Sequence, residues 1–437
     1  WNATPHNCGV HGAHLIRRED SVLENFFQCP AVLPGLRDSF YWESLEELTS
    51  YLQDRGHTDR MMREYLRVAI HFVYWVESQR IAHPMDEEET VRRFRMDHLA
   101  SCRCPVPSAD RVRVRAGLKH LMHVFRVDGH VISTMKCKGP VDIVIEQFEN
   151  HLMTVCGASA STCRQYTRFA RQFLKATYGH SPINLAEVTV NDVERFVTQK
   201  AENAATETAK AIATSVRSFL RYMAFRGHCD HRLAEGVPTI PHWRLTSLPK
   251  NLDEGQVRRL LEAFDLSTDI GRRDHAIVLC LIRLGLRANE TARLSLDEID
   301  WRKGLLRIHH GKGQRVNVLP LGADIGREIA HYIRYDRPPT QRRNVFLQHR
   351  PPIGEGLKSS TVTAIVRRAL KRSGIVTPFR GSHVLRHTAA TRMIQAGVTI
   401  KEVADILGHR SISTTGIYAK VDLPALSAVA MPWPGVQ

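Results

Sequence analysis

The sequence predicts a mainly α-helical protein with one α+β domain in its C-terminal part. Apolar residues recur at helical spacing across residues 42–130 and again across residues 141–229. Further along, two short runs typical of β-strands, Leu305–His309 and Val316–Leu319, flank a glycine-containing turn. These observations indicate two small helical bundles followed by a domain with a small β-hairpin sheet.

The first bundle is predicted to occupy residues 41–138. Residues 1–40 are predicted to be an irregular arm, because Pro30 and Pro34 interrupt any helix there. The helices of the bundle are predicted from apolar residues that recur every three or four positions. These residues are Leu45, Leu48, Leu52, Met61, Tyr65, Val68, Phe72, Leu118, Leu121, Met122 and Phe125.

The second bundle is predicted to occupy residues 139–232, and it repeats the layout of the first. His120–Phe125 ahead of Gly129 is similar to Ser218–Met223 ahead of Gly227, at an offset of about one hundred residues. This offset favours a duplicated helical domain. Coincidence is the alternative, since amphipathic helices often resemble one another.

The composition points to a polyanionic partner. Of 437 residues, 61 are basic and 45 acidic, which gives a formal net charge of +16 at pH 7. Such an excess attracts polyanions, of which nucleic acid is the usual one. No apolar run approaches the roughly eighteen residues of a membrane span, and no signal peptide is recognisable, so we expect a cytoplasmic protein. Nine cysteines without disulfide-like spacing fit a reducing compartment.

Two groups of residues have side chains that commonly bind metals. Cys102 and Cys104 are separated by one residue. The other group, near the start of the chain, consists of His6, Cys8, His11 and His14. Neither group has the paired C-x-x-C spacing of a zinc site, so we interpret them as free thiols and surface histidines, with a metal site as the alternative. The sequence also shows no convincing carboxylate cluster or phosphate-binding glycine loop, and we predict neither a metal nor a nucleotide cofactor.

The C-terminal domain is predicted to occupy residues 252–421, after an extended, proline-containing linker at residues 233–251. Gly285 ends one of its helices and begins a turn that carries Arg287. Helices of this domain are predicted at Asp253–Phe264, Asp274–Leu284 and Ser360–Ser373.

The most informative stretch runs from residue 382 to residue 420. His383 and Arg386 are three residues apart on a predicted helix, so they share one face. Ser382 can cap this helix at its start, and Gly397 can end it.

The second half of this stretch adds two more reactive side chains. Thr399 and Glu402 predict a capping box for the next helix, and Gly408 ends that helix and presents His409. Tyr418 follows nine residues later. Histidines, an arginine and a tyrosine at helix ends are typical of a phosphate site with a nucleophile beside it.

These motifs carry a family resemblance. H-x-L-R-H-T, L-G-H and I-Y-A occur in that order and resemble the C-terminal signature of the tyrosine recombinases, or phage-type integrases. The family also has an arginine in a G-L-R-x-x-E context, which Arg287 matches, and a lysine at a hairpin turn, which Lys312 matches. The resemblance covers roughly residues 140–421.

The resemblance implies six catalytic residues and a 3′-phosphotyrosine intermediate. The tyrosine would attack the phosphorus, which the two arginines would clamp. The first histidine would orient or deprotonate the tyrosine, the second would donate to a phosphate oxygen, and the lysine would protonate the leaving 5′ oxygen. The six residues are Arg287, Lys312, His383, Arg386, His409 and Tyr418.

The second bundle resembles the core-binding, SAM-like domain of the same family, which clamps DNA. Lys/Arg rows and helix amino ends suit phosphates, although ordinary solvated helix faces are the alternative for each residue. The residues expected to contact DNA are Thr162, Arg164, Arg168, Lys175, Lys210 and Arg217. The first bundle is either a further DNA-gripping domain or a surface for protein contacts.

We therefore expect a site-specific recombinase that integrates, excises or transposes a mobile element. Its partners would be double-stranded DNA recombination sites and three further copies of itself on two sites, with a monomer or dimer when free. Accessory recombinases or DNA-bending proteins are further expected partners. Residues 422–437 would dock on a neighbouring subunit, with packing on their own domain as the alternative. The alternative functions are a chromosome or plasmid dimer resolvase, a type IB topoisomerase-like strand transferase and a DNA-binding architectural protein with a relic site.

Overall fold

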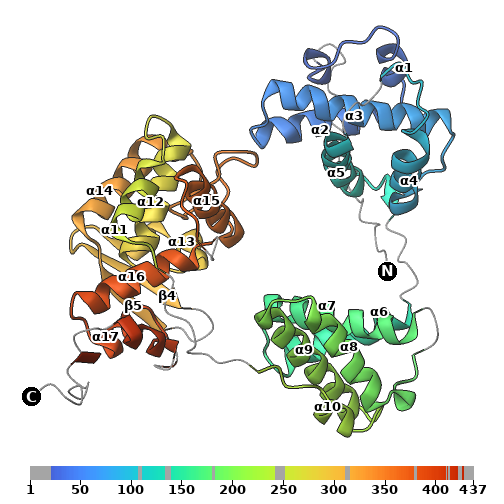
Figure 1. Ribbon diagram of the computed structural model, residues 1–437. Helices are drawn as coiled ribbons and strands as arrows, with labels where there is room; N and C mark the ends of the chain where they lie inside the picture. The colour runs from blue at the N-terminus through green and yellow to red at the C-terminus, as the bar shows by residue number, and fades with distance from the viewer. Residues whose placement is uncertain are drawn as a thin grey trace, which may run out of the picture. The chain divides into compact units, whose positions relative to one another are not determined.

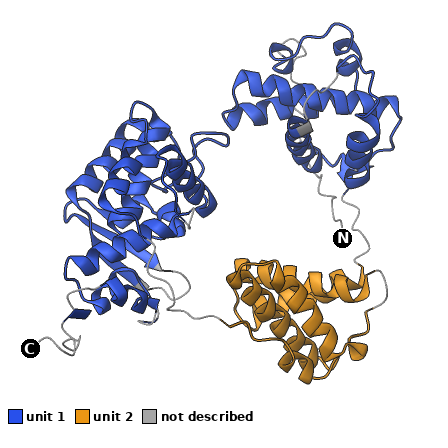
Figure 2. Cartoon of the chain, in the orientation of Figure 1, with its two compact units in different colours: residues 1–132, 247–437 blue, residues 133–246 orange. Residues whose placement is uncertain are grey.

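The computed structural model describes the chain in several segments. They are residues 21–106, 111–132, 139–179, 183–241, 251–310, 315–377, 381–409, 411, 414–421 and 426–427. The chain divides into two compact units, residues 1–132 with 247–437 and residues 133–246 (Figure 2). Helices predominate, beside a three-stranded antiparallel sheet and a two-stranded pair (Figure 1). The prediction of a mainly helical chain with a small sheet is confirmed. The predicted domain limits stay predictions, apart from the arm and the start of the linker described below.

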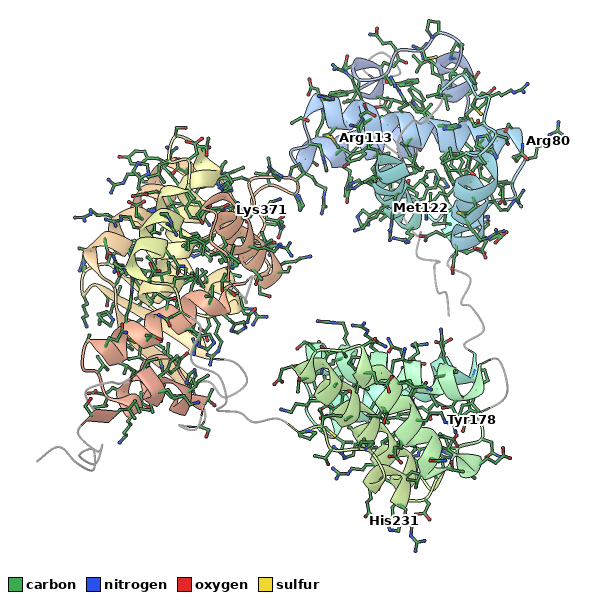
Figure 3. The ribbon with its side chains drawn as sticks, in the orientation of Figure 1. Arg80, Arg113, Met122, Tyr178, His231 and Lys371 are labelled. Carbon is green, nitrogen blue, oxygen red and sulfur yellow. The ribbon has the colours of Figure 1, made fainter. Side chains whose placement is uncertain are left out.

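Residues 21–132, here called the N-terminal bundle, form a helical bundle around their own apolar core. The long helix α3 packs against α2 and α5, and side chains such as that of Met122 fill the interior (Figure 3). Thr58 begins α3 by accepting a hydrogen bond from the backbone N–H of Met61. The elements are α2 (Trp42–Asp54), α3 (Asp59–Ser78), β1 (Met85–Asp86), α4 (Glu87–Arg93), the π-helical turn η2 (Phe94–His98), α5 (Arg111–Val127) and β2 (Val131–Ile132). Strands β1 and β2 pair in parallel.

The prediction of an irregular arm is wrong for residues 21–40. This segment contains η1 (Leu23–Asn25) and α1 (Leu33–Arg37), and Leu23 and Leu36 are buried in the core of the N-terminal bundle. Pro34 lies in the first turn of α1, where a backbone N–H has no partner within the helix, so the proline does not interrupt it. Residues 1–20 lie outside the described residues, and so does the predicted group of His6, Cys8, His11 and His14.

Residues 139–241, here called the middle bundle, form a second helical bundle with a core of their own. Phe148, Phe173 and Phe219 are fully buried in it, and each such side chain contributes about 1.5–3 kcal/mol through burial. Its four longer helices, α6 to α9, follow one another along the chain as α2 to α5 do in the N-terminal bundle. That one bundle is a duplicate of the other stays a prediction. The elements are α6 (Pro140–Thr154), α7 (Ala160–Tyr178), η3 (Leu185–Glu187), α8 (Val190–Glu202), α9 (Thr206–Phe225) and α10 (Arg232–Glu235).

The predicted linker begins too early. Helix α10 (Arg232–Glu235) extends into residues 233–251 and packs against α9 and α8. Leu233, Ala234 and Val237 are buried in the core of the middle bundle. The linker was predicted from the prolines that follow. In the structure, the three buried apolar side chains pack the chain against the bundle as far as Val237.

Residues 251–427, here called the C-terminal domain, are built around the buried helix α12. Thr268 caps this helix, which therefore begins five residues earlier than predicted and packs against α11, α14, α15 and α16. The predictions of α11 and α15 are confirmed to within two residues. The helices are α11 (Glu254–Glu262), α12 (Asp269–Arg283), α13 (Ala288–Arg293), η4 (Leu296–Glu298), α14 (Ala323–His331), η6 (Tyr332–Asp336), α15 (Ser359–Arg372), α16 (His383–Gln395), α17 (Ile400–Ile406) and η8 (Gly416–Val421).

The sheet of this domain contains the predicted hairpin and one more strand. Strands β4 (Leu305–His310) and β5 (Arg315–Pro320) pair antiparallel, with His310 opposite Arg315. The sequence analysis did not predict β3 (Ile299–Asp300), a two-residue strand that pairs with the start of β4. Its alternation is too short to be recognised as a strand pattern. The hairpin turn, residues 311–314, lies outside the described residues, and Lys312 with it.

The helix ends of the last part of the chain are mostly as predicted. The capping box of Thr399 and Glu402 begins α17, and Gly397 and Gly408 have φ of +86° and +60° just after helices α16 and α17. The predicted side-chain cap of Ser382 is wrong. Ser382 has helical backbone angles, φ −59° and ψ −21°, and its hydroxyl makes no capping bond, because a capping side chain needs an extended backbone at that residue.

Within the described residues, no helix combines the length and the apolar character needed to cross a membrane.

Candidate active site

A sharp turn after α12 positions the first arginine of the site. Gly285 has φ +64°, and a Cβ at this residue would lie 2.6 Å from Leu407 Cδ2, so the turn can pack on the end of α17 because it has no side chain. Arg287 follows and begins α13. Glu290 accepts hydrogen bonds from the Arg287 backbone N–H at 2.8 Å and from its Nη1 at 2.7 Å. One carboxylate thus fixes both the backbone and the guanidinium of Arg287.

The second arginine, Arg386, reaches the same place from α16. Its side chain donates to the Gly285 carbonyl at 2.6 Å and to the Leu407 carbonyl at 2.5 Å. Arg287 Nη2 donates to the next carbonyl, that of Gly408, at 3.2 Å. Two guanidinium groups from distant segments therefore rest on consecutive carbonyls at the C-terminal end of α17, which carries the negative end of the helix dipole.

The electrostatics of the two arginines favour an anion beside them. Arg386 is 6% exposed, and its burial, together with the charge of Arg287, lowers its pKa to about 10. The two side-chain hydrogen bonds described for Arg386 end on neutral carbonyl oxygens, and Glu290 is a single charge beside two cations. A phosphate would add negative charge beside these cations and could accept hydrogen bonds from Arg386.

Tyr418 lies on the short helix η8 and is 2% exposed. Its hydroxyl shares a hydrogen bond of 2.7 Å with His387 Nδ1. Burial raises the pKa of Tyr418 to about 12, although the Arg386 charge opposes that shift. The tyrosine is therefore a protonated phenol at neutral pH, with an imidazole nitrogen at hydrogen-bond distance from its oxygen.

Three histidines surround the arginines and the tyrosine. Burial lowers the pKa of His383 and His387, and the Arg386 charge acts in the same direction on both. Burial, followed by the charges of Arg386 and Arg287, lowers the pKa of His409 to about 4, and its Nδ1 is 2.7 Å from Thr415 Oγ1. All three imidazoles are neutral at pH 7, so each can accept a proton or donate one N–H.

The sequence analysis assigned no role to His387. It lies four residues after His383 on α16, so the two share one face of the helix. The motif H-x-L-R-H-T contains both histidines, and the i, i+4 spacing was the available signal. The position of η8 in the fold determines that Tyr418 contacts His387.

The hairpin that carries Lys312 is anchored beside the site, although the lysine itself lies outside the described residues. Asn317 Nδ2 on β5 donates to the Asp405 carbonyl on α17 at 2.5 Å. Another lysine near this hairpin, Lys303, lies before β4, at the opposite end of this six-residue strand from the turn. At about 3.3 Å per residue, the two ends of β4 are roughly 20 Å apart.

The expected DNA contacts in the middle bundle separate into two groups. Arg164 and Arg168 on α7 line one open concavity together with Thr208, near the start of α9. Lys175 is exposed further along α7, Thr162 bonds its capping neighbour Ser159, and Lys210 lies 3.8 Å from Glu207. Arg217 instead donates to the carbonyls of Val237 and Pro238, so it holds the chain after α10.

Comparison with known proteins identifies the family. Residues 250–423 match the phage integrase family, and residues 145–227 match the phage integrase N-terminal SAM-like domain. The Sinorhizobium fredii protein named "Putative integrase/recombinase y4rA" is 36% identical over 388 residues, which are 88% of this chain and 92% of that protein. The chain belongs to the tyrosine recombinase (phage integrase) family. Tyrosine recombinase XerA of Pyrococcus furiosus is 33% identical over 279 residues, 64% of this chain and 89% of XerA.

Solved recombinase structures share the fold. XerH bound to a palindromic difH substrate matches with a TM-score of 0.54 at 18% identity, over 80% of this recombinase and 97% of XerH. A lambda integrase dimer bound to a COC′ core site matches with a TM-score of 0.51 at 17% identity, over 68% and 98% of the two chains. Tyrosine recombinases are enzymes that cleave and rejoin DNA strands, so the predicted family and enzyme class are confirmed.

Proposed function

We propose that this recombinase cleaves and rejoins DNA at specific sites through a covalent 3′-phosphotyrosine on Tyr418. The observation that carries the proposal is the meeting of Arg287 and Arg386 on the consecutive carbonyls of Gly408 and Leu407, just after α17. Both charges also act on His409. The charge of Arg386 acts on Tyr418, which supports a common site for the nucleophile and the two cations. Such an arrangement suits in-line attack on a phosphodiester.

The proposed reaction balances without a further reactant. Tyr418 Oη forms a bond to the phosphorus while the bond from phosphorus to the 5′ oxygen breaks. The phenol proton passes to His387, its hydrogen-bond partner in the free protein, and His383 orients that pair from one helical turn earlier. Lys312 gives a proton to the departing 5′ oxygen. The phosphotyrosine keeps the ester bond, so a 5′-hydroxyl from another strand can reverse the step.

The two arginines and His409 would stabilise the transition state. Arg386 donates hydrogen bonds to two carbonyls, and a guanidinium has more N–H donors than these two bonds use. Removing one preorganised donor to a developing oxyanion typically lowers the rate about 10²–10³-fold. The two arginines, Arg287 and Arg386, form a clamp that is therefore proposed to affect the rate of cleavage more than DNA affinity.

The proposed biological role is integration, excision or transposition of a mobile element. XerA matches 64% of this chain, whereas y4rA matches 88% of it, so the similarity to the integrase-named relative extends into the N-terminal bundle. We propose double-stranded DNA sites as the substrate, four protomers on two sites, and residues 422–437 as the segment that docks on a neighbour. Action at the bacterial nucleoid, with accessory recombinases or DNA-bending proteins, follows from this role.

A suicide-substrate experiment tests the chemistry. The Tyr418→Phe protein is first used to select bound duplexes from a random library, and these duplexes are then nicked beside the cleavage position so that religation is blocked. We expect the unmodified protein to form a covalent protein–DNA adduct that protease digests, and Tyr418→Phe to form none. Tyr335→Phe is the matched control, since Tyr335 is 68% exposed in the same domain.

Two outcomes would refute the proposal. An adduct that persists in Tyr418→Phe would mean another nucleophile, and the absence of any adduct with the unmodified protein on selected duplexes would mean a non-catalytic DNA-binding protein. A substrate with two sites then separates recombination from a topoisomerase-like activity. A recombinase yields exchanged strands, and deletion of residues 422–437 is expected to abolish that exchange while leaving the adduct.

A further inference from the structure

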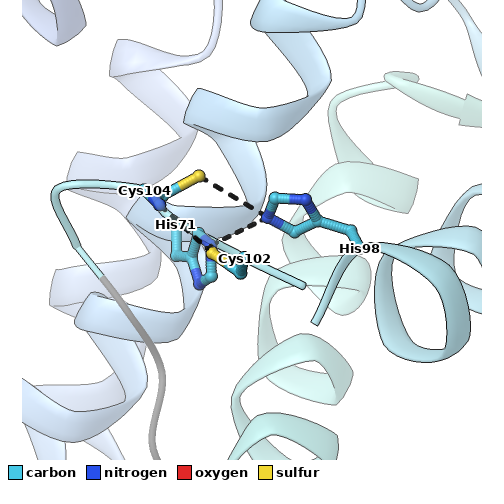
Figure 4. A group of neighbouring side chains, drawn as sticks. All are labelled: His71, His98, Cys102 and Cys104. Atoms are coloured by element: carbon cyan, nitrogen blue, oxygen red, sulfur yellow. Dashed lines mark hydrogen bonds between the residues drawn. The ribbon is translucent and has the colours of Figure 1, made fainter. Parts of the chain in front are cut away.

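Four side chains of metal-ligand type converge in the N-terminal bundle, far from the residues of the proposed reaction in the sequence. His71 comes from α3, His98 from the end of η2, and Cys102 and Cys104 from the loop that follows (Figure 4). One ligand atom of each residue lies within 4.8 Å of the other three. His71 is fully buried and the other three are partly exposed, so the cluster lies at the edge of the core.

The distances are close to those of a tetrahedral zinc site. Zn–N bonds of about 2.0–2.1 Å and Zn–S bonds of about 2.3 Å place neighbouring ligand atoms about 3.3–3.8 Å apart. Here the two Nε2 atoms of His71 and His98 are 3.0 Å apart. Cys102 Sγ is 3.1 Å from His71 Nε2, and Cys104 Sγ is 3.5 Å from His98 Nε2. Shifts of a few tenths of an ångström in these three pairs would accommodate the ion.

Hydrogen bonding alone does not account for these contacts. A neutral imidazole Nε2 offers either one N–H or one lone pair. The Nε2 atoms of His71 and His98 face each other, and each also faces a sulfur, so three close contacts share two hydrogen-bonding positions. A cation at the centre would bind all four atoms at once through their lone pairs.

The surroundings hold the ligands in this orientation. The His98 ring stacks on Phe94 at 5.3 Å and lies 5.5 Å from the Trp75 ring. The backbone N–H of Cys104 donates to Cys102 Sγ at 3.3 Å, a contact that stabilises negative charge on that sulfur.

We propose that His71, His98, Cys102 and Cys104 form a structural zinc site. Thiolate and imidazole ligands suit Zn²⁺, and two thiolates balance its charge. Four protein ligands leave no open position for substrate, so the ion would tie the loop of residues 99–106 to α3. The proposal replaces the interpretation of Cys102 and Cys104 as free thiols, because His71 lies 31 residues before Cys102 and meets the cysteines only in the fold.

Metal analysis of the full chain tests the site. The protein is purified under reducing conditions without chelator, and its zinc content is measured by mass spectrometry. We expect about one zinc per chain, and loss of that zinc in the Cys102→Ser/Cys104→Ser variant. Cobalt in place of zinc is expected to give thiolate charge-transfer absorption and tetrahedral visible bands, both lost in the same variant. Cys8→Ser is the matched control and keeps the metal, which distinguishes this cluster from the group near the start of the chain.

A second measurement, on the unmodified protein, tests the proposal even if the double cysteine variant does not fold. Chelation of the unmodified protein is expected to raise hydrogen exchange in residues 99–106, and added zinc is expected to restore protection, with no change in the middle bundle. The proposal is overturned if the purified protein holds no zinc and gives no cobalt spectrum. It is equally overturned if the double cysteine variant keeps its zinc, or if Cys8→Ser loses it.

Discussion

Replacing Gly285 by alanine tests whether the glycine turn is what brings the arginine clamp together. The alanine would have to adopt φ +64°, and its Cβ would lie 2.6 Å from Leu407 Cδ2. The left-handed backbone costs about 1–2 kcal/mol, and overpacking against a fully buried side chain typically costs about 1–3 kcal/mol. The expected loss in the free energy of unfolding of the C-terminal domain is therefore about 2–5 kcal/mol.

The matched control is Gly374→Ala in the same domain. Gly374 has φ +65°, but a Cβ there meets nothing within 4 Å, so this variant should lose only the backbone part, about 1–2 kcal/mol. Urea unfolding of the full chain, followed by hydrogen exchange in peptides of α16 and α17, measures both losses. The Gly285 carbonyl accepts from Arg386, so we also expect slower cleavage for Gly285→Ala and unchanged cleavage for Gly374→Ala.

A double-mutant cycle with Leu407→Ala isolates the contact. In the unmodified protein this truncation removes a buried side chain and should cost about 2–5 kcal/mol, whereas in the Gly285→Ala background it also removes the clash. The two changes should therefore couple by about 1–3 kcal/mol. Equal losses for the two glycine variants, or additive losses in the cycle, would show that the turn does not depend on its approach to α17.

Three further predictions concern the charges. Arg386→Lys cannot bond both the Gly285 and the Leu407 carbonyls, so cleavage of nicked duplexes should fall about 10²–10³-fold while DNA affinity changes little; a uniform loss of affinity would contradict this. Burial lowers the pKa of His409 from 6.5 to about 4, so the unfolded chain binds more protons between these values and stability should fall as the pH drops from 6.5 to 4. Urea midpoints across this range should depend less on pH in His409→Gln, and an unchanged slope would refute the assignment. Arg164→Ala should reduce the salt dependence of DNA binding by about one unit of slope, whereas Arg217→Ala should lower stability and leave that slope unchanged.

Local patterns in the sequence predicted most of the C-terminal domain. The capping box of Thr399 and Glu402 and the positive φ of Gly408 depend on residues within one helical turn, so the sequence contains all the information they need. Helix α15 was predicted to within one residue at each end, because its apolar stripe is regular. The order of the motifs predicted the family, which the comparisons confirm.

Features that depend on tertiary contacts were missed. The bond between Tyr418 and His387 spans 31 residues, and no local rule selects His387 over His383. The arm prediction failed because Leu23 and Leu36 gain their stability from burial against a distant core. His71 lies among apolar residues of a helix, so its sequence neighbours give no sign that it could be a metal ligand. The roles of the six catalytic residues, Lys312 among them, stay predictions that the proposed experiments test.

The two arginines are held differently, since Arg287 is paired with the Glu290 carboxylate whereas Arg386 bonds backbone carbonyls. A carboxylate opposite Arg386 as well would neutralise the site, and a phosphate would then have to displace a second ion pair. Arg386 instead rests on the Gly285 and Leu407 carbonyls, which orient the guanidinium without cancelling its charge. Burial, followed by the charge of Arg287, lowers the pKa of Arg386 to about 10. A phosphate would offset the repulsion between the two arginines on arrival. In the free protein the Arg386 charge opposes the effect of burial on the pKa of Tyr418, so it favours loss of the phenol proton.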